Sequence, residues 1–127
     1  HNLVKYNERN RSRINQSISG AIFKIHLDNT HPMAYGYNDN HYYSLKIGDS
    51  AYSLLENGYN IGYLKQDPKP TSGFAGQEAL DKISNSLVFG HQNYGKWSFI
   101  YMVDNPLFRS FWENGKLLLV NSIFFVE

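Results

Sequence analysis

The chain contains no cysteine among its 127 residues. Without a thiol it cannot form a disulfide bond, bind a metal through thiolates or use a cysteine nucleophile. This absence leaves the cellular compartment open, because a domain without cysteine is stable in either redox environment.

Long apolar runs and a strong net charge are also missing. No stretch approaches the ~18 apolar residues of a membrane-spanning helix, and the formal net charge is only +1. We therefore expect neither a membrane nor nucleic acid as a partner. With 42% hydrophobic and 16% aromatic residues, the chain can nevertheless bury a substantial core.

The histidines do not have the spacing of a catalytic zinc site. No two of them lie three or four residues apart, and neither H-E-x-x-H nor H-x-x-E occurs, whereas such sites commonly take two ligands from one short element. The G-x-S-x-G motif and both glycine-rich phosphate-binding motifs are missing as well. We expect no catalytic residue, no metal ligand and no cofactor in this chain.

The remaining sequence divides into a polar segment, residues 1–19, expected to be a lead-in arm or helix, and a single globular domain, residues 20–127. Short β-branched and aromatic runs predict strands, and apolar residues at helical spacing predict one short helix. The strands are expected at 21–27, 42–47, 59–65, 86–92 and 97–103, the last two forming a hairpin, and the helix at 77–84. QDPKPTSG is expected to end the third strand, and SGFAG to be a glycine-rich turn.

The C-terminal part has the most ambiguous pattern. Asp104 and Pro106 are typical of a helix start, and Asn114–Gly115 of a helix end. Residues 116–126 are apolar on every side, so periodicity does not separate a buried strand from a buried helix. Their length favours a helix.

Arg109 and Trp112 lie three apart on the turn expected after Pro106, so both can face one neighbour. We expect them to be structural, with Arg109 paired to a carboxylate such as Asp28 or Asp104.

The stretch DNTHP, residues 28–32, combines acid, hydroxyl and imidazole groups but predicts a turn. Asp28 is a turn former, and His31 precedes Pro32, which disfavours helical backbone at the histidine.

The tyrosine-rich loop 35–43 has two interpretations. Alternate tyrosines can cover a sheet face, or their rings and polar tips can contact a sugar, a peptide or a protein partner. The candidate contact residues are Tyr35, Tyr37, His41, Tyr42 and Tyr43.

The segments GAIFKIHLDNTHPMAYGY, NIGYLK, SGFAG and DNPLFRSFWENGKLLLVNSIFF together resemble a known family. They are similar to the C-terminal region of large bacterial proteins whose N-terminal half is a zinc carboxypeptidase of the carboxypeptidase A-like family. That region is similar to a class I glutamine amidotransferase fold without its catalytic residues. The resemblance covers about residues 14–127 and is most specific in Asp104–Phe125.

The resemblance implies a secreted or periplasmic parent protein that removes C-terminal residues from peptides, with zinc bound only in an upstream peptidase domain. This chain would be its non-catalytic accessory domain, with that peptidase domain as partner. The alternative is a carbohydrate- or peptide-binding module that uses the loop 35–43.

We expect an α+β fold: a mixed or mostly antiparallel sheet of about five strands, a short helix and a C-terminal helix. The alternative is part of a flavodoxin-like α/β fold. The C-terminal helix, being apolar all round, is expected to be buried on all sides. Because so small a sheet covers one face of it, an apolar surface should remain for an upstream domain or for a homodimer.

Overall fold

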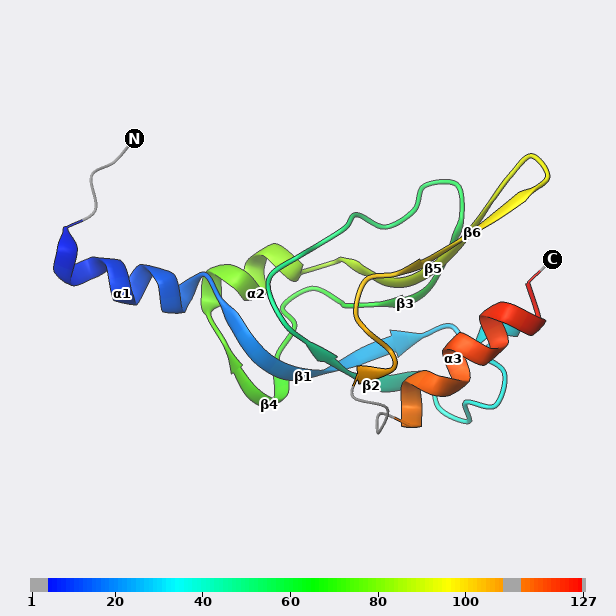
Figure 1. Cartoon of the computed structure of the whole chain (residues 1–127), viewed down its shortest axis with the longest axis horizontal. Helices are drawn as coiled ribbons and strands as arrows, with labels where there is room; N and C mark the ends of the chain where they lie inside the picture. Colours follow the sequence, from blue (N-terminus) through cyan, green and yellow to red (C-terminus); the bar gives the residue numbers. More distant parts are fainter. Residues whose placement is uncertain (1–4, 109–112, 127) are drawn as a thin grey trace.

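The structure is a computed structural model that describes residues 5–108 and 113–126. Within them the fold is α+β, as predicted, with a six-stranded antiparallel sheet and helices at both ends of the molecule (Figure 1). In chain order the elements are α1 (Tyr6–Asn15), β1 (Ile18–Leu27), the 3-10 helix η1 (Pro32–Ala34), β2 (His41–Lys46), β3 (Tyr59–Tyr63), β4 (Pro70–Ala75), α2 (Gln77–Ile83), β5 (Leu87–Tyr94), β6 (Trp97–Met102) and α3 (Glu113–Phe124).

The sheet has the strand order β2-β1-β3-β5-β6, and β4 pairs with β1 beside this path. Every pairing between the described strands is antiparallel. The flavodoxin-like alternative, which needs parallel strands, is therefore wrong. Strands β5 and β6 show one cause of the antiparallel pairing. Only residues 95–96 connect them, and so short a connection cannot form the crossover that parallel strands need.

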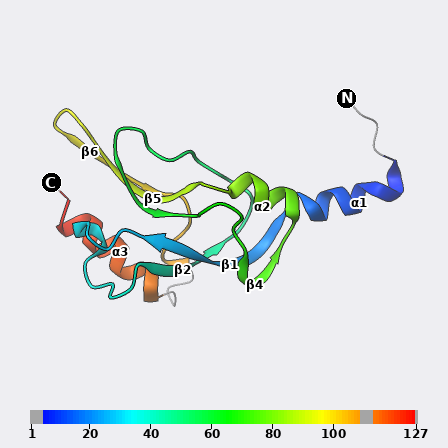
Figure 2. The same cartoon turned by 180° about the vertical axis from the view of Figure 1, so that it is seen from behind.

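The core lies between the sheet and the helices η1, α2 and α3. Alternate residues of β1 are buried, among them Phe23 and Ile25, because successive strand side chains point to opposite faces. Met33 of η1 and Leu118 of α3 join the same cluster. This packing holds α3 against η1 and β2 at the end of the molecule opposite α1 (Figure 2).

Strand β4 was not predicted. Proline and glycine in PTSGFA predict a break between strands, but residues 70–75 pair with β1 along Ile18–Phe23. Gly73 has φ +88°, and a Cβ there would overlap the Gly20 carbonyl and the Ala21 backbone. The glycine permits a close approach of two strands instead of a turn.

The C-terminal helix was predicted correctly as a helix but with wrong ends. Residues 104–108 form turns before α3, which runs through Asn114 and Gly115 instead of ending there. A Cβ on Gly115 would overlap the backbone of Pro106, so this glycine is required for close packing of the helix on the turn at Pro106. Arg109 and Trp112 lie outside the described residues.

Candidate functional site

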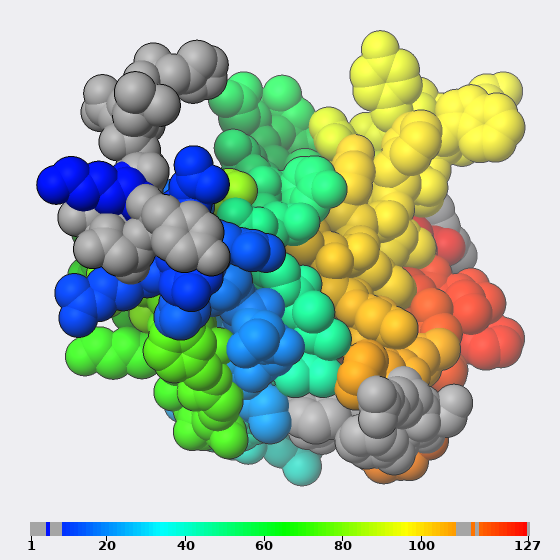
Figure 3. Space-filling view, turned by 60° about the vertical axis from the view of Figure 1, so that its left-hand side comes forward, coloured from blue at the N-terminus to red at the C-terminus, as the bar shows by residue number. Residues whose placement is uncertain are grey.

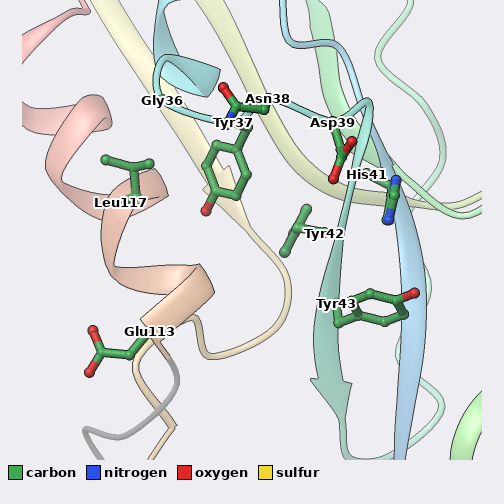
Figure 4. Close-up of a pocket in the computed structure, with 9 residues that line it drawn as sticks. All are labelled: Gly36, Tyr37, Asn38, Asp39, His41, Tyr42, Tyr43, Glu113 and Leu117. Carbon is green, nitrogen blue, oxygen red and sulfur yellow. The ribbon is translucent and has the colours of Figure 1, made fainter.

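A pocket of about 400 Å³ lies between the tyrosine-rich loop, β2 and the start of α3 (Figure 4). We call it the tyrosine pocket; it is lined by Gly36, Tyr37, Asn38, Asp39, His41, Tyr42, Tyr43, Glu113 and Leu117. Four of the five contact residues that the sequence suggested therefore lie around one hollow.

Tyr37 forms the wall between the loop and the helix. Its ring lies between α3 and β2 (Figure 4), with its centroid 6.1 Å from that of Tyr42. Burial raises the pKa of Tyr37 to about 12, and a hydrogen bond with the Leu118 backbone opposes that rise. The phenol is therefore neutral at physiological pH.

The strand β2 sends its two tyrosines to opposite faces. Tyr42 is 6% exposed, and burial, with Asp104 nearby, raises the pKa of its phenol. Tyr43 is half-buried on the other face, where its ring meets His41 edge-on at 5.7 Å. Tyr35 lies outside the pocket, 51% exposed, with its ring 5.6 Å from that of Phe125. The tyrosines thus neither all cover the sheet nor lie side by side.

The lining of the tyrosine pocket combines ring faces with groups that form hydrogen bonds. The carboxylates of Asp39 and Glu113, the amide of Asn38 and the imidazole of His41 surround the rings. Such a mixture suits a polar, uncharged ring or a peptide segment, which stacks on an aromatic face and forms hydrogen bonds at its edge.

The DNTHP stretch forms the predicted turn. The Asp28 Oδ1 accepts hydrogen bonds from the Thr30 backbone N–H at 3.1 Å and from its hydroxyl at 2.5 Å. His31 caps η1, because its Nδ1 accepts the Met33 backbone N–H at 3.1 Å, and Pro32 is the first residue of that helix.

The turn also brings His31 to a histidine that sequence reasoning missed. The two ring centroids of His31 and His91 are 5.6 Å apart. His91 lies on β5 in register with Tyr59 of β3, and these rings stack at 5.7 Å with planes 20° apart. Nothing in the local sequence connects two histidines so far apart along the chain.

These rings line a second hollow of about 420 Å³ near the end of α3, here called the histidine pocket. Its walls include Asp28, His31, Tyr59, His91 and Phe125. The pKa of His31 is lowered, mainly by burial and further by His91, while Asp28 raises it. His31 is therefore neutral at pH 7.

Asp104 is a structural residue within the core. Its Oδ1 lies 3.2 Å from the Lys46 Nζ, with side-chain exposures of 8% and 3%. Burial raises the pKa of Asp104 more than Lys46 lowers it. Within the described residues the partner of Asp104 is thus Lys46, whereas the sequence suggested Arg109 as one candidate partner. Pro106 packs on Gly115.

Two further features bear on function. Within residues 5–108 and 113–126, no three histidine, aspartate or glutamate side chains cluster so that they could hold a metal ion. In the same residues no helix has the length and apolar character to cross a bilayer.

Comparison of the chain with protein-family models, with curated proteins and with solved structures gives no match.

Proposed function

We propose that this chain is a non-catalytic accessory domain that docks on the peptidase domain of a secreted, bacterial zinc carboxypeptidase-like protein. The exposed apolar surface of α3 carries the proposal, since it fits a docking element. The sequence resemblance supports the identity of the partner, a parent enzyme that hydrolyses peptides from their C-terminal end.

Helix α3 buries only one of its sides. Gly115, Leu118 and Asn121 face the rest of the domain, so the domain itself covers one face of the helix. The apolar surface expected to remain is present: Val120, Ile123, Phe124 and Phe125 are 46%, 65%, 73% and 50% exposed. We call these four residues the α3 surface; exposed apolar side chains gathered on one element are a feature of interaction sites.

The β5–β6 hairpin lies at the same end of the molecule as α3 (Figures 1 and 2). Tyr94 and Trp97, at its tip, are each 73% exposed, and the hairpin projects from the body of the domain (Figure 3). Aromatic residues are enriched at protein interfaces. The α3 surface and the hairpin together suit a neighbouring domain.

The test is coexpression of this chain with the peptidase domain encoded upstream of it, as separate polypeptides. The two should copurify, and Ile123→Glu should abolish the complex. The matched control is Ile47→Glu, because Ile47 is 60% exposed at the end of β2. The proposal would be refuted if the upstream reading frame encoded no zinc peptidase. It would also be refuted if the complex still formed with the Ile123→Glu variant.

The tyrosine pocket favours a second function, a carbohydrate- or peptide-binding module. Its stacking faces and flanking carboxylates are the specific observation. Binding of oligosaccharides or short peptides, followed by tryptophan and tyrosine fluorescence, should be weakened by Tyr43→Ala. Tyr52→Ala, at a residue 59% exposed outside that pocket, should have no effect.

A further inference from the structure

His91 is a buried polar side chain that the protein itself does not satisfy. It is 5% exposed, and neither Nδ1 nor Nε2 has a hydrogen-bond partner in the part of the chain that the structure describes. Leaving such a group unsatisfied costs about 1–3 kcal/mol. Because buried polar groups normally have partners, an unpaired imidazole that lines a pocket indicates a ligand-binding group.

The walls around His91 define the charge that the histidine pocket accepts. From the turn before η1 come Asp28 and neutral His31, from β3 comes Tyr59, and from the end of α3 comes Phe125. Ile100 of β6, opposite His91 in the sheet, carries no charge. The formal charge among these groups is the Asp28 carboxylate, so the pocket favours a cation over an anion.

The cation that fits is organic and not a metal ion. His31 uses the lone pair of Nδ1 to accept the Met33 N–H, so its neutral ring holds its proton on Nε2 and presents no lone pair to a metal. Tyr59 and Phe125, 55% and 50% exposed, provide aromatic faces on which an ammonium group is attracted by cation–π interaction. Each His91 nitrogen exposes less than 1 Å² to solvent, so a side chain at the mouth of the pocket must move before an ammonium group can donate a hydrogen bond to it.

We propose that the histidine pocket binds a primary ammonium group carried on an apolar body. His91 accepts a hydrogen bond from the ammonium, Asp28 supplies the opposite charge at the rim, and Tyr59 and Phe125 hold the apolar part. A free amine, a lysine side chain and a peptide N-terminus all carry this chemistry.

The first experiment is an NMR titration of the whole chain with benzylamine, read at the histidine ring protons. A ligand of so few atoms is expected to bind with a Kd of about 1 mM. The His31 and His91 signals should shift together and saturate. Benzyl alcohol and phenylacetate, which have the same ring but no ammonium group, should shift them much less. Stronger binding of phenylacetate, or tight binding of Zn²⁺ at the same signals, would overturn the proposal.

The pH dependence of benzylamine binding tests the proposal without any variant. Protonation of His31 places positive charge in the pocket. Because the pKa of His31 is lowered from its ordinary value, affinity should be constant between about pH 7 and 8, where benzylamine stays protonated, and fall as the pH drops below about 6.5. An affinity that rises as the pH falls would show that the pocket selects anions.

Two variants test the assigned groups. His91→Phe keeps a buried ring but loses the acceptor, so affinity should fall at least about tenfold. Asp28→Asn keeps an oxygen for the Thr30 hydrogen bonds, and affinity should fall about two- to fivefold because Asp28 is exposed. His26→Phe, on β1 and in the lining of neither pocket, is the matched control and should leave binding unchanged. Equal affinities in wild type and His91→Phe would refute the role of His91.

The source of the amine is separated by two further probes. Nα-acetyl-lysine methylamide presents only a side-chain ammonium, and a dipeptide amide with phenylalanine first presents only an N-terminal ammonium. The probe that competes more strongly with benzylamine identifies the natural class. Failure of benzylamine and both probes to bind would refute this proposal without affecting the docking surface on α3.

Discussion

The buried ion pair between Lys46 and Asp104 should be far more important for stability than its surface counterpart. Lys46→Met leaves the Asp104 carboxylate, 8% exposed, without its cation. Breaking a buried pair in this way costs about 3–5 kcal/mol. For a domain of this size the whole free energy of unfolding is about 6–19 kcal/mol, so the loss should lower the Tm by about 10–20 °C.

The matched control is Lys82→Met, which breaks the Lys82–Asp49 pair. That pair is shorter, 2.6 Å against 3.2 Å, but its side chains are 58% and 41% exposed. An exposed pair of this kind is screened by solvent and contributes little to stability. Burial, not distance, therefore decides which substitution matters.

The assay is equilibrium urea unfolding at pH 7 of wild type, Lys46→Met, Asp104→Asn and the double variant. The double variant should be more stable than the sum of the single losses predicts, with a coupling of about 0.5–3 kcal/mol, because it leaves no uncompensated charge. The reasoning would be refuted if Lys46→Met and Lys82→Met lowered the free energy of unfolding equally. Strictly additive effects of Lys46→Met and Asp104→Asn would refute it as well.

Three other predictions follow from the same packing. Asn121→Ala should lower the free energy of unfolding by about 2–3 kcal/mol, because the buried Asn121 Nδ2 donates to the carbonyls of Met33 at 3.1 Å and Tyr35 at 2.7 Å; chemical denaturation measures the loss. Since the pKa of Asp104 is raised by burial, its contribution to stability is fully present below about pH 3.9 and is lost as the pH rises through the folded-state pKa. The stability of wild type relative to Asp104→Asn should fall across that window. Finally, the isolated chain should self-associate through the α3 surface, and light scattering over a concentration series should show a dimer that Ile123→Glu dissociates; a monomer at every concentration would contradict this.

Much of the fold could be predicted because local patterns and tertiary packing agree. The β5–β6 hairpin has β-rich runs around a short Asn/Gly loop, and its strands pair where that pattern placed them. The helix at Gln77–Ile83 also matches its apolar spacing. The α3 segment was ambiguous by periodicity, and its length gave the correct element.

Other features could not be predicted because they depend on contacts between distant residues. Gly73 and Gly115 resemble breakers in the sequence, but each allows a close backbone approach. His31 was assigned to a turn, which is correct, yet the same turn places it against His91. The register of β3 with β5, which puts Tyr59 beside His91, is set by the whole sheet.

The sequence by itself determined the class of this protein: a cysteine-free α+β domain with a polar N-terminal segment, a β-hairpin and an apolar C-terminal helix. Local propensity and hydrophobic periodicity are sufficient for that, since they act within a few residues. The tertiary structure alone decided which polar groups became buried together, such as Lys46 with Asp104 and His31 with His91. Burial and proximity are properties of the packed chain, and they convert ordinary side chains into an ion pair and a pocket.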